Sequence, residues 1–221
     1  MEQIVRILDI HNVTHNVKQF IIEKPDGFTF TPGQATELSI NQPQWEGQRN
    51  PFTFTCLTDE HYLEFTIKIY SDHPGVTNQL GELQVGDELI LREAWGAIEY
   101  KGPGYFIAGG AGITPFIAIL RQLYKDGKLE DNILFFSNKT NDDIILADEL
   151  KMMLGENARF TTTQQKGGKN DHRRIDEAFL KAEISDFTKH FYVCGPDPMV
   201  AGITETLTKL GANADTIVFE K

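Results

Sequence analysis

The feature that most constrains the fold of this 221-residue chain is a change of pattern near residue 100. Before it, short apolar or alternating runs rich in Val, Ile, Phe and Thr predict β-strands. These runs cover residues 4–10, 17–23, 35–40, 51–57, 62–70 and 88–92, with one short helix expected at 76–83. Short strands separated by Gly and Pro turns predict a six-stranded antiparallel β-barrel.

After Lys101-Gly102-Pro103-Gly104, apolar strands alternate with amphipathic helices. The strands are predicted at 105–108, 133–137, 159–163, 191–194 and 216–219, and the helices near 115–125, 143–154, 176–182 and 198–210. Such alternation predicts an α/β domain, a Rossmann-like parallel sheet with helices on both faces. We therefore expect two domains, residues 1–100 and 101–221, and a mobile loop at 164–171.

The composition argues against several kinds of partner and site. A net charge of −11 disfavours nucleic acid or an anionic membrane, because both attract clustered Lys and Arg. Cys56 and Cys194 are too few for a disulfide framework or a four-thiolate iron–sulfur cluster, and the histidines show no metal spacing. The first ten residues lack a signal-peptide core and no apolar run approaches ~20 residues, so a cytoplasmic protein is expected.

A glycine-rich turn at 109–112 separates the first predicted strand of the second half from a helix that begins near Thr114-Pro115. Gly110 and Gly112 would let a diphosphate approach the backbone, and the helix N-terminus offers N–H groups and a positive dipole end. Pro115 suits the first helical turn. The turn predicts nucleotide binding; close packing is the alternative explanation for its glycines.

Two further strand ends lie at the same predicted edge of the sheet, where ligands of such folds bind. The second strand runs into Ser137-Asn138-Lys139-Thr140, with no acid for an NAD ribose before Asp142. Lys139 could bind a 2′-phosphate, which favours NADPH, although a solvated loop charge explains it equally well. Cys194 ends the 191–194 strand and should lie near the glycine turn; an inert buried thiol is the alternative.

Taken in order, these motifs resemble those of the ferredoxin–NADP reductase superfamily of flavoproteins. GGAGITP at 109–115 and CGPDPM at 194–199 follow Pro32-Gly33-Gln34, PFTFT at 51–55 and Gly75-Val76-Thr77 in the family's order, over essentially the whole chain. The resemblance is to the flavodoxin or ferredoxin reductase branch. It implies bound FAD, a nicotinamide nucleotide, and electron transfer to flavodoxin, ferredoxin or a small-molecule acceptor.

The resemblance also implies roles for single residues. Thr53 matches the hydroxyl residue that approaches flavin N5, and Cys194 with Gly195 matches the strand end that flanks the nicotinamide; Thr53 and Cys194 are therefore the expected catalytic residues. Phe52 matches the aromatic on the isoalloxazine ring, and Thr77 the element that receives the flavin diphosphate. The other cofactor-binding residues implied are Asn50, Pro51, Lys68, Tyr70, Gly75, Val76, Gly110, Gly112, Thr114 and Pro115.

One departure leaves the flavin phosphate without an assigned partner. Many relatives have an arginine where this chain has Asn50, and Arg49 stands one residue earlier, where a strand reverses its side-chain direction. Either a bulge re-aims Arg49, or the phosphate relies on backbone donors. The expected function is an NAD(P)H-dependent flavoprotein reductase. The alternatives are an electron-transfer subunit of a larger complex and, favoured by Asn50, a non-catalytic nucleotide-sensing module.

Overall fold

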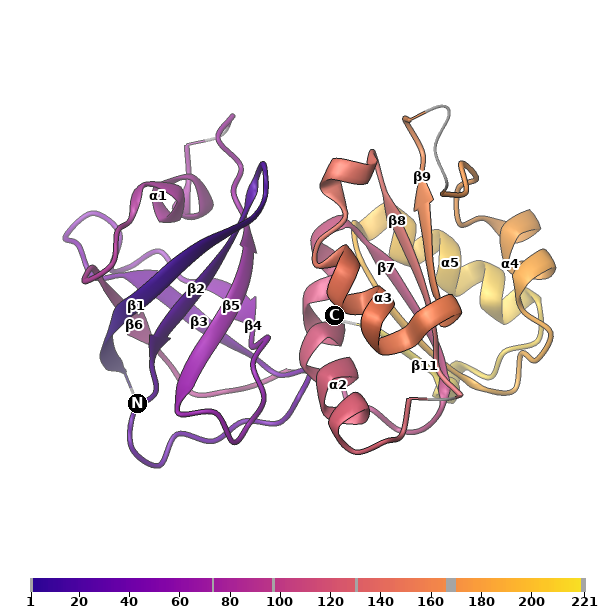
Figure 1. Ribbon diagram of the computed structural model, residues 1–221, viewed down its shortest axis with the longest axis horizontal. Helices are drawn as coiled ribbons and strands as arrows, with labels where there is room; N and C mark the ends of the chain where they lie inside the picture. Colours follow the sequence, from indigo (N-terminus) through magenta and orange to yellow (C-terminus); the bar gives the residue numbers. More distant parts are fainter. Residues whose placement is uncertain (1, 73, 97, 130, 166–169, 220–221) are drawn as a thin grey trace.

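The computed structural model describes residues 2–72, 74–96, 98–129, 131–165 and 170–219, which form a β-barrel and an α/β domain side by side (Figure 1). Part of the predicted mobile loop, 166–169, lies outside these residues. The barrel contains β1 (Gln3–Thr14), β2 (Val17–Glu23), β3 (Ala35–Ile40), β4 (Asn50–Thr53), β5 (Tyr62–Lys68), α1 (Val76–Glu82) and β6 (Glu88–Leu91).

The barrel strands pair antiparallel in the order β4-β3-β6-β1-β2-β5. The sheet closes because Phe54, directly after β4, forms a bridge with Phe65 of β5, and the Thr55 amide donates to the Glu64 carbonyl at 2.8 Å. Phe20, Phe54 and Phe65 are fully buried in the core. The predicted six-stranded antiparallel barrel is confirmed; the expected 51–57 strand is shorter because Phe54 makes only this single bridge before the chain turns.

The α/β domain has a parallel sheet in the order β11-β10-β7-β8-β9. Its elements are β7 (Gly104–Gly109), η1 (Gly110–Ile113), α2 (Thr114–Lys125), β8 (Ile133–Asn138), η2 (Asn141–Asp143), α3 (Ala147–Leu154), η3 (Gly155–Asn157), β9 (Ala158–Thr162), α4 (Glu177–Glu183), β10 (His190–Cys194), α5 (Asp197–Lys209), η4 (Ala214–Thr216) and β11 (Ile217–Phe219). Apolar residues of α2 and α3 cover one face of the sheet, and those of α4 and α5 cover the other. The predicted Rossmann-like architecture is confirmed.

One helix begins later than its apolar pattern predicted. The expected 143–154 helix starts at Ala147, because Thr140 and Asp143 form a capping box around the short η2 turn. Ile144 is then extended, and Leu146 takes a left-handed φ of 51° before the helix begins. Local side-chain hydrogen bonds therefore replace the first helical turn.

The helix α2 lies between the sheet and the barrel (Figure 1). Gly33 of the barrel packs so closely that an added Cβ would lie 2.0 Å from the Ile98 carbonyl oxygen and 3.0 Å from Ile119 of α2. The connection between the domains is anchored by the Tyr192 hydroxyl, which accepts from the amides of Lys101 and Gly102 and donates to the Gly102 carbonyl. The predicted boundary at 100/101 falls in this connection and stays a prediction.

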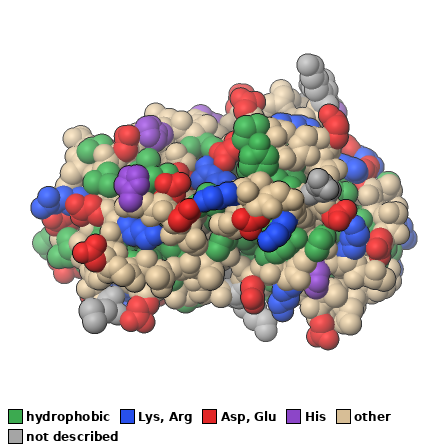
Figure 2. Space-filling view, turned by 60° about the horizontal axis from the view of Figure 1, so that its bottom comes forward, with side chains coloured by type: hydrophobic (Ala, Val, Ile, Leu, Met, Phe, Trp, Pro, Cys, Tyr) green, Lys and Arg blue, Asp and Glu red, His purple; other side chains and the backbone are tan. Residues whose placement is uncertain are grey.

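On the face of the molecule that Figure 2 shows, acidic and basic side chains are interspersed, and neither kind forms a separate patch. Among the described residues, no helix has both the length and the apolar character needed to cross a bilayer.

Candidate functional site

The carboxyl ends of β7 and β10 form the centre of the candidate site. These neighbouring parallel strands pair Ala108 with Cys194, while β8 lies on the other side of β7. After β7 the chain continues to β8 on one side of that strand, and it later adds β10 on the opposite side. The strand order therefore reverses at β7, which makes the ends of β7 and β10 a topological switch point. The helices α2 and α5 both begin just beyond these strand ends, so two positive helix termini point to the same edge.

The predicted nucleotide turn is built on two different glycine requirements. Gly110 has a left-handed φ of 54°, and a Cβ there would meet no atom within 4 Å, so the backbone at this point faces open space. At Gly112 a Cβ would lie 2.4 Å from the Cys194 carbonyl oxygen and 2.5 Å from the Gly195 nitrogen. Gly112 therefore holds the turn directly against the β10 end, and Gly110 leaves room beside it.

Cys194 lies on the barrel-facing side of the sheet. The residue is 8% exposed and belongs to the apolar cluster that contains Ile113 and buried residues of α2. The barrel contributes Thr53, which is 9% exposed and pairs with Ala35. Phe52, the preceding residue, packs partly against the barrel core. Both expected catalytic side chains are thus nearly buried, each at the end of a strand.

A groove of about 1050 Å³ separates the two domains at the same end of the molecule, the upper end in Figure 1. Lys68 and Tyr70 line its barrel side and Lys139 its α/β side, so three residues predicted from distant parts of the sequence meet there. The Lys68 ammonium also lies 5.8 Å from the Tyr70 ring centre. Cations for phosphate groups and an aromatic face for stacking are the donor set that a dinucleotide requires.

Three aspartates, Asp72, Asp142 and Asp143, also line the groove, and Asp143 is the one that contacts the barrel. Burial opposes ionisation of its carboxyl, but hydrogen bonds from Thr140 and the charges of Lys68 and His15 lower its pKa overall. His15 Nε2 lies 3.8 Å from the Asp143 carboxylate, an ion pair when His15 is protonated, which joins the β1–β2 turn of the barrel to η2. Asp143 therefore stays an anion that ties the groove walls together.

Arg49 is directed away from Phe52. Its guanidinium lies 3.0 Å from Glu2 and 3.7 Å from Glu37. The β3–β4 register advances one residue at a time from Asn50 to Thr53, so no bulge interrupts that stretch. Asn50, two residues before Phe52, therefore lies on the same face of the strand as the aromatic ring.

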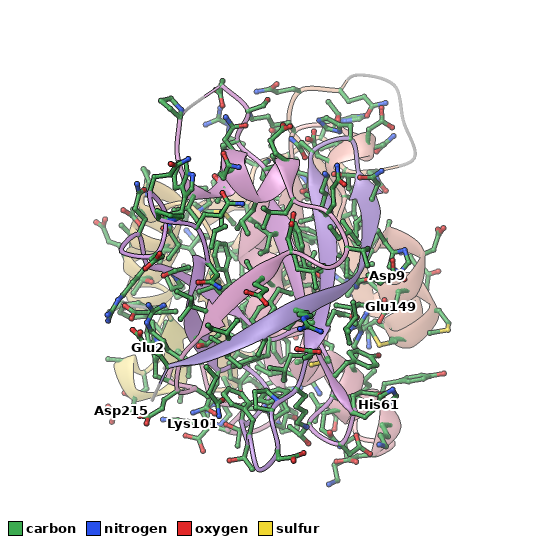
Figure 3. All side chains as sticks on the ribbon, turned by 90° about the vertical axis from the view of Figure 1, so that its left-hand side faces the viewer. Glu2, Asp9, His61, Lys101, Glu149 and Asp215 are labelled. Carbon is green, nitrogen blue, oxygen red and sulfur yellow. The ribbon has the colours of Figure 1, made fainter. Side chains whose placement is uncertain are left out.

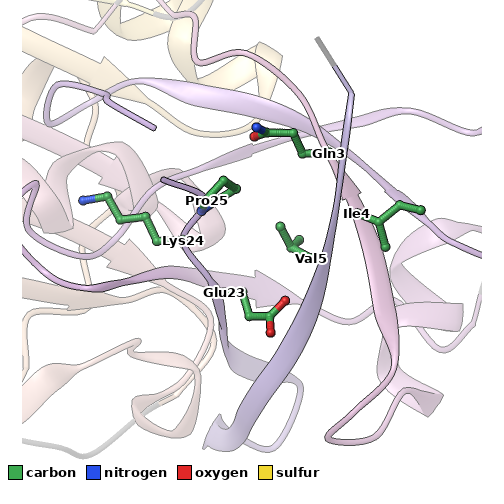
Figure 4. A pocket seen from close by; sticks show the side chains of 6 residues that line it. All are labelled: Gln3, Ile4, Val5, Glu23, Lys24 and Pro25. Carbon is green, nitrogen blue, oxygen red and sulfur yellow. The ribbon is translucent and has the colours of Figure 1, made fainter. Parts of the chain in front are cut away.

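The other predicted residues lie at two separate places. Gly75, Val76 and Thr77 form the start of α1, with Val76 buried in the barrel. Thr114 and Pro115 begin α2 directly after the nucleotide turn. A second pocket of about 530 Å³, where β1 diverges from β2, is lined by Gln3, Ile4, Val5, Glu23, Lys24 and Pro25 and contains none of the predicted residues (Figure 4).

The sequence prediction missed two side chains near the site. Trp95 exchanges backbone hydrogen bonds of 2.6 and 2.7 Å with Ala35, the pairing partner of Thr53, and its side chain is 44% exposed. The sequence signal that could have found Trp95 was a tryptophan standing just after the last barrel strand. Arg121 joins α2 to the barrel, and its helical pattern alone gave no sign of this contact.

Comparison with known proteins also identifies a nucleotide-binding domain in the second half of the chain. The family model of the oxidoreductase NAD-binding domain matches residues 106–205. The reductase component of propane 2-monooxygenase from Rhodococcus jostii is 26% identical over 90% of this chain and 57% of its own length. NADH–cytochrome b5 reductase 1 from Arabidopsis thaliana is 30% identical over 66% of this chain and 55% of its own. The chain thus spans little more than half of these two relatives.

The fold has close counterparts among solved structures. A ferredoxin NADP⁺ reductase from Neisseria gonorrhoeae, solved with FAD and NADP, aligns with a TM-score of 0.86 over 99% of this chain and 98% of its own, at 21% identity. At 21% identity the alignment is evidence for the fold alone. The order of motifs, the two-domain fold and the NAD-binding match all agree with the resemblance to the ferredoxin–NADP reductase superfamily.

Proposed function

We propose that this chain is an NAD(P)H-dependent flavoprotein reductase that passes electrons through FAD to a separate acceptor. The observation that carries the proposal is the interdomain groove, into which Lys68 and Tyr70 project from the barrel and Lys139 from the α/β domain. The groove opens at the sheet edge that also holds the nucleotide turn. FAD bound to the barrel and NAD(P)H bound to the α/β domain would meet at this seam.

The side chains present fit both cofactors. For FAD we propose Phe52, Thr53, Lys68 and Tyr70, with Pro51 at the strand and Gly75, Val76 and Thr77 at the start of α1. Between the two phosphate candidates we favour Asn50, because it shares a strand face with Phe52, whereas Arg49 is paired with Glu2 and Glu37. For the nucleotide we propose Gly110, Gly112, Thr114, Pro115, Lys139, Cys194 and Gly195.

FAD supplies the chemistry when bound, since it accepts a hydride from NAD(P)H and releases electrons to an acceptor. The protein's contribution is then placement and exclusion of water. We propose that the Thr53 hydroxyl donates a hydrogen bond to flavin N5, and that the Cys194 thiol packs beside the nicotinamide. Thr53 and Cys194 are both nearly buried, so little water reaches their side chains.

The choice of nucleotide is assigned to Lys139. Its side chain is exposed at the groove wall, where it would pair with a 2′-phosphate, so we propose that NADPH is preferred. Lys139→Ala should raise KM for NADPH about tenfold, the loss expected for one charged hydrogen bond, and leave KM for NADH unchanged. Lys128→Ala, at an exposed lysine beyond the other end of α2, is the control. Equal changes for both nucleotides would contradict the assignment.

A second candidate is supported by the Rhodococcus relative, which is named as the reductase component of a monooxygenase. In that case the chain would deliver electrons only within a larger assembly. Turnover with ferricyanide but not with isolated flavodoxin or ferredoxin, together with elution of the native protein at high mass, would favour this candidate.

The deciding experiment for the proposed function is a visible spectrum of the purified protein, loaded with FAD and titrated without oxygen, one sample with NADH and a second sample with NADPH. We expect the oxidised flavin bands to appear on loading and to bleach with NADPH at lower concentration than with NADH. A protein that retains no flavin and leaves the reduced nucleotide unchanged would refute the proposal.

A further inference from the structure

We infer that Arg121 is a positioning residue for hydride transfer, because it fixes the angle between the barrel and the helix that carries the nucleotide turn. The inference rests on the proposed function. Arg121 itself lies outside the groove and is not among its lining residues. Its effect would pass through the backbone segments that it joins.

The contacts of Arg121 reach both domains. On the barrel side, Nη1 donates to the Thr55 carbonyl and to Glu64 Oε1, each at 2.6 Å. On the α/β side, Nε and Nη2 donate to the two carboxylate oxygens of Glu149 at 2.6 and 2.9 Å. Glu149 extends from α3 beside the barrel (Figure 3). A planar guanidinium with a bidentate partner on one side and two acceptors on the other has little freedom to rotate.

Burial makes the loss of one partner more costly here than in a surface ion pair. The side chains of Arg121 and Glu64 are only 18% and 7% exposed. Burial opposes the charge on Arg121, yet the hydrogen bonds and charges of Glu149 and Glu64 raise its pKa overall. Without the guanidinium, Glu64 would remain nearly buried and would face Glu149 across the seam, so attraction between the domains would become repulsion.

The position of Arg121 turns a small change of angle into a displacement at the reacting groups. It lies about two turns, roughly 10 Å, along α2 from Thr114, where the nucleotide turn ends. Thr55, which it holds, is two residues or roughly 7 Å past Thr53. A rotation of about 5° at Arg121 would displace the nucleotide turn by roughly 1 Å relative to Thr53, and a misplacement of that size can slow a reaction about a hundredfold.

The same helix offers a matched control one turn further on. Lys125 pairs with Asp59 of the barrel at 2.5 Å, but both side chains are about half exposed or more, at 49% and 63%. Exposed pairs of this kind contribute little to structure. Lys125→Gln thus removes an interdomain ion pair of the same helix without disturbing a buried carboxylate.

The test compares Arg121→Gln and Arg121→Lys with Lys125→Gln in the FAD-loaded protein. Stopped-flow reduction by NADPH should be slowed 10- to 100-fold in Arg121→Gln and less in Arg121→Lys, with nucleotide Kd within about threefold of wild type; Lys125→Gln should keep the wild-type rate. Should Arg121→Gln fail to fold, Arg121→Lys alone decides, because an ammonium cannot serve Thr55, Glu64 and both oxygens of Glu149 together.

A second readout does not depend on activity. Spin labels at Leu8→Cys on β1 and Glu205→Cys on α5, both exposed positions, report the distance between the domains, while Cys56 and Cys194 are buried. The distance distribution should broaden in Arg121→Gln and stay narrow in Lys125→Gln. Unchanged rates and distances in both Arg121 variants, or equal effects in Lys125→Gln, would overturn the inference. A wild-type protein that NADPH does not reduce would refute the proposed function instead, while the label distances would still test Arg121.

Discussion

Replacing Gly112 by alanine tests the nucleotide turn where its packing is tightest. The new methyl group would lie 2.4 Å from the Cys194 carbonyl oxygen and 2.5 Å from the Gly195 nitrogen, both backbone atoms that cannot turn aside. Ordinary contact needs about 3.4 Å, so the turn and the β10 end must separate by roughly 1 Å. Overpacking of this kind costs about 1–3 kcal/mol of stability. The same 1 Å shift should slow hydride transfer to FAD by up to about a hundredfold.

The assay is stopped-flow reduction of the FAD-loaded protein by NADPH, together with urea unfolding. Gly202→Ala in α5 is the matched control, because a Cβ there meets nothing within 4 Å. Alanine in a helix interior is favoured over glycine, so this control should be more stable by about 0.5–1 kcal/mol and should react at the wild-type rate. If Gly112→Ala also kept the wild-type rate and nucleotide affinity, the turn would not be where the nicotinamide nucleotide binds.

Three other changes probe single side chains. Thr53→Val should keep the fold and the flavin but slow flavin reduction about tenfold, the worth of one hydrogen bond; an unchanged stopped-flow rate would remove Thr53 from the mechanism. Cys194→Ala should lower the reduction rate more than the flavin content, and equal losses would indicate a structural role. Burial raises the pKa of Cys56 from 9.0 to about 11. The unfolded thiol therefore ionises first, and wild-type stability should fall between pH 9 and 11 by roughly 2–3 kcal/mol relative to Cys56→Ala. Parallel pH profiles of the two proteins would contradict this expectation.

The fold was predictable because local pattern and tertiary structure agree along most of this chain. The strand at 105–108 and the helix at 115–125 appear within one residue of their predicted bounds. A short continuous apolar run is typical of a buried strand, and apolar residues at helical spacing are typical of a helix packed on a core. The start of α3 was not predictable from the same pattern. There the capping box of Thr140 and Asp143 competes with helix formation, and the apolar residues Ile144 and Ile145 are buried before the helix begins, the first extended and the second in a turn.

The candidate site was predictable in its parts but not in its assembly. The glycine turn and Cys194 lie together because the carboxyl ends of parallel strands share an edge, which is a rule of the fold. That Lys68 and Lys139 line one groove depends on how the barrel docks against the sheet. The docking depends on Gly33, Ile119, Arg121 and Glu64, whose pairing spans long sequence distances that no periodicity records.

The hydroxyl of Tyr192 has a consequence for building chimaeras from this protein. It ties Lys101 and Gly102 to β10, and its ring stacks on Tyr100 and Phe106 at centroid distances of 5.8 and 4.5 Å. The segment from Tyr100 onwards therefore belongs, in its contacts, to the α/β module. A graft that exchanges the barrel for that of a relative should be joined before Tyr100, because a junction after it would pair the tyrosine stack with a foreign ring.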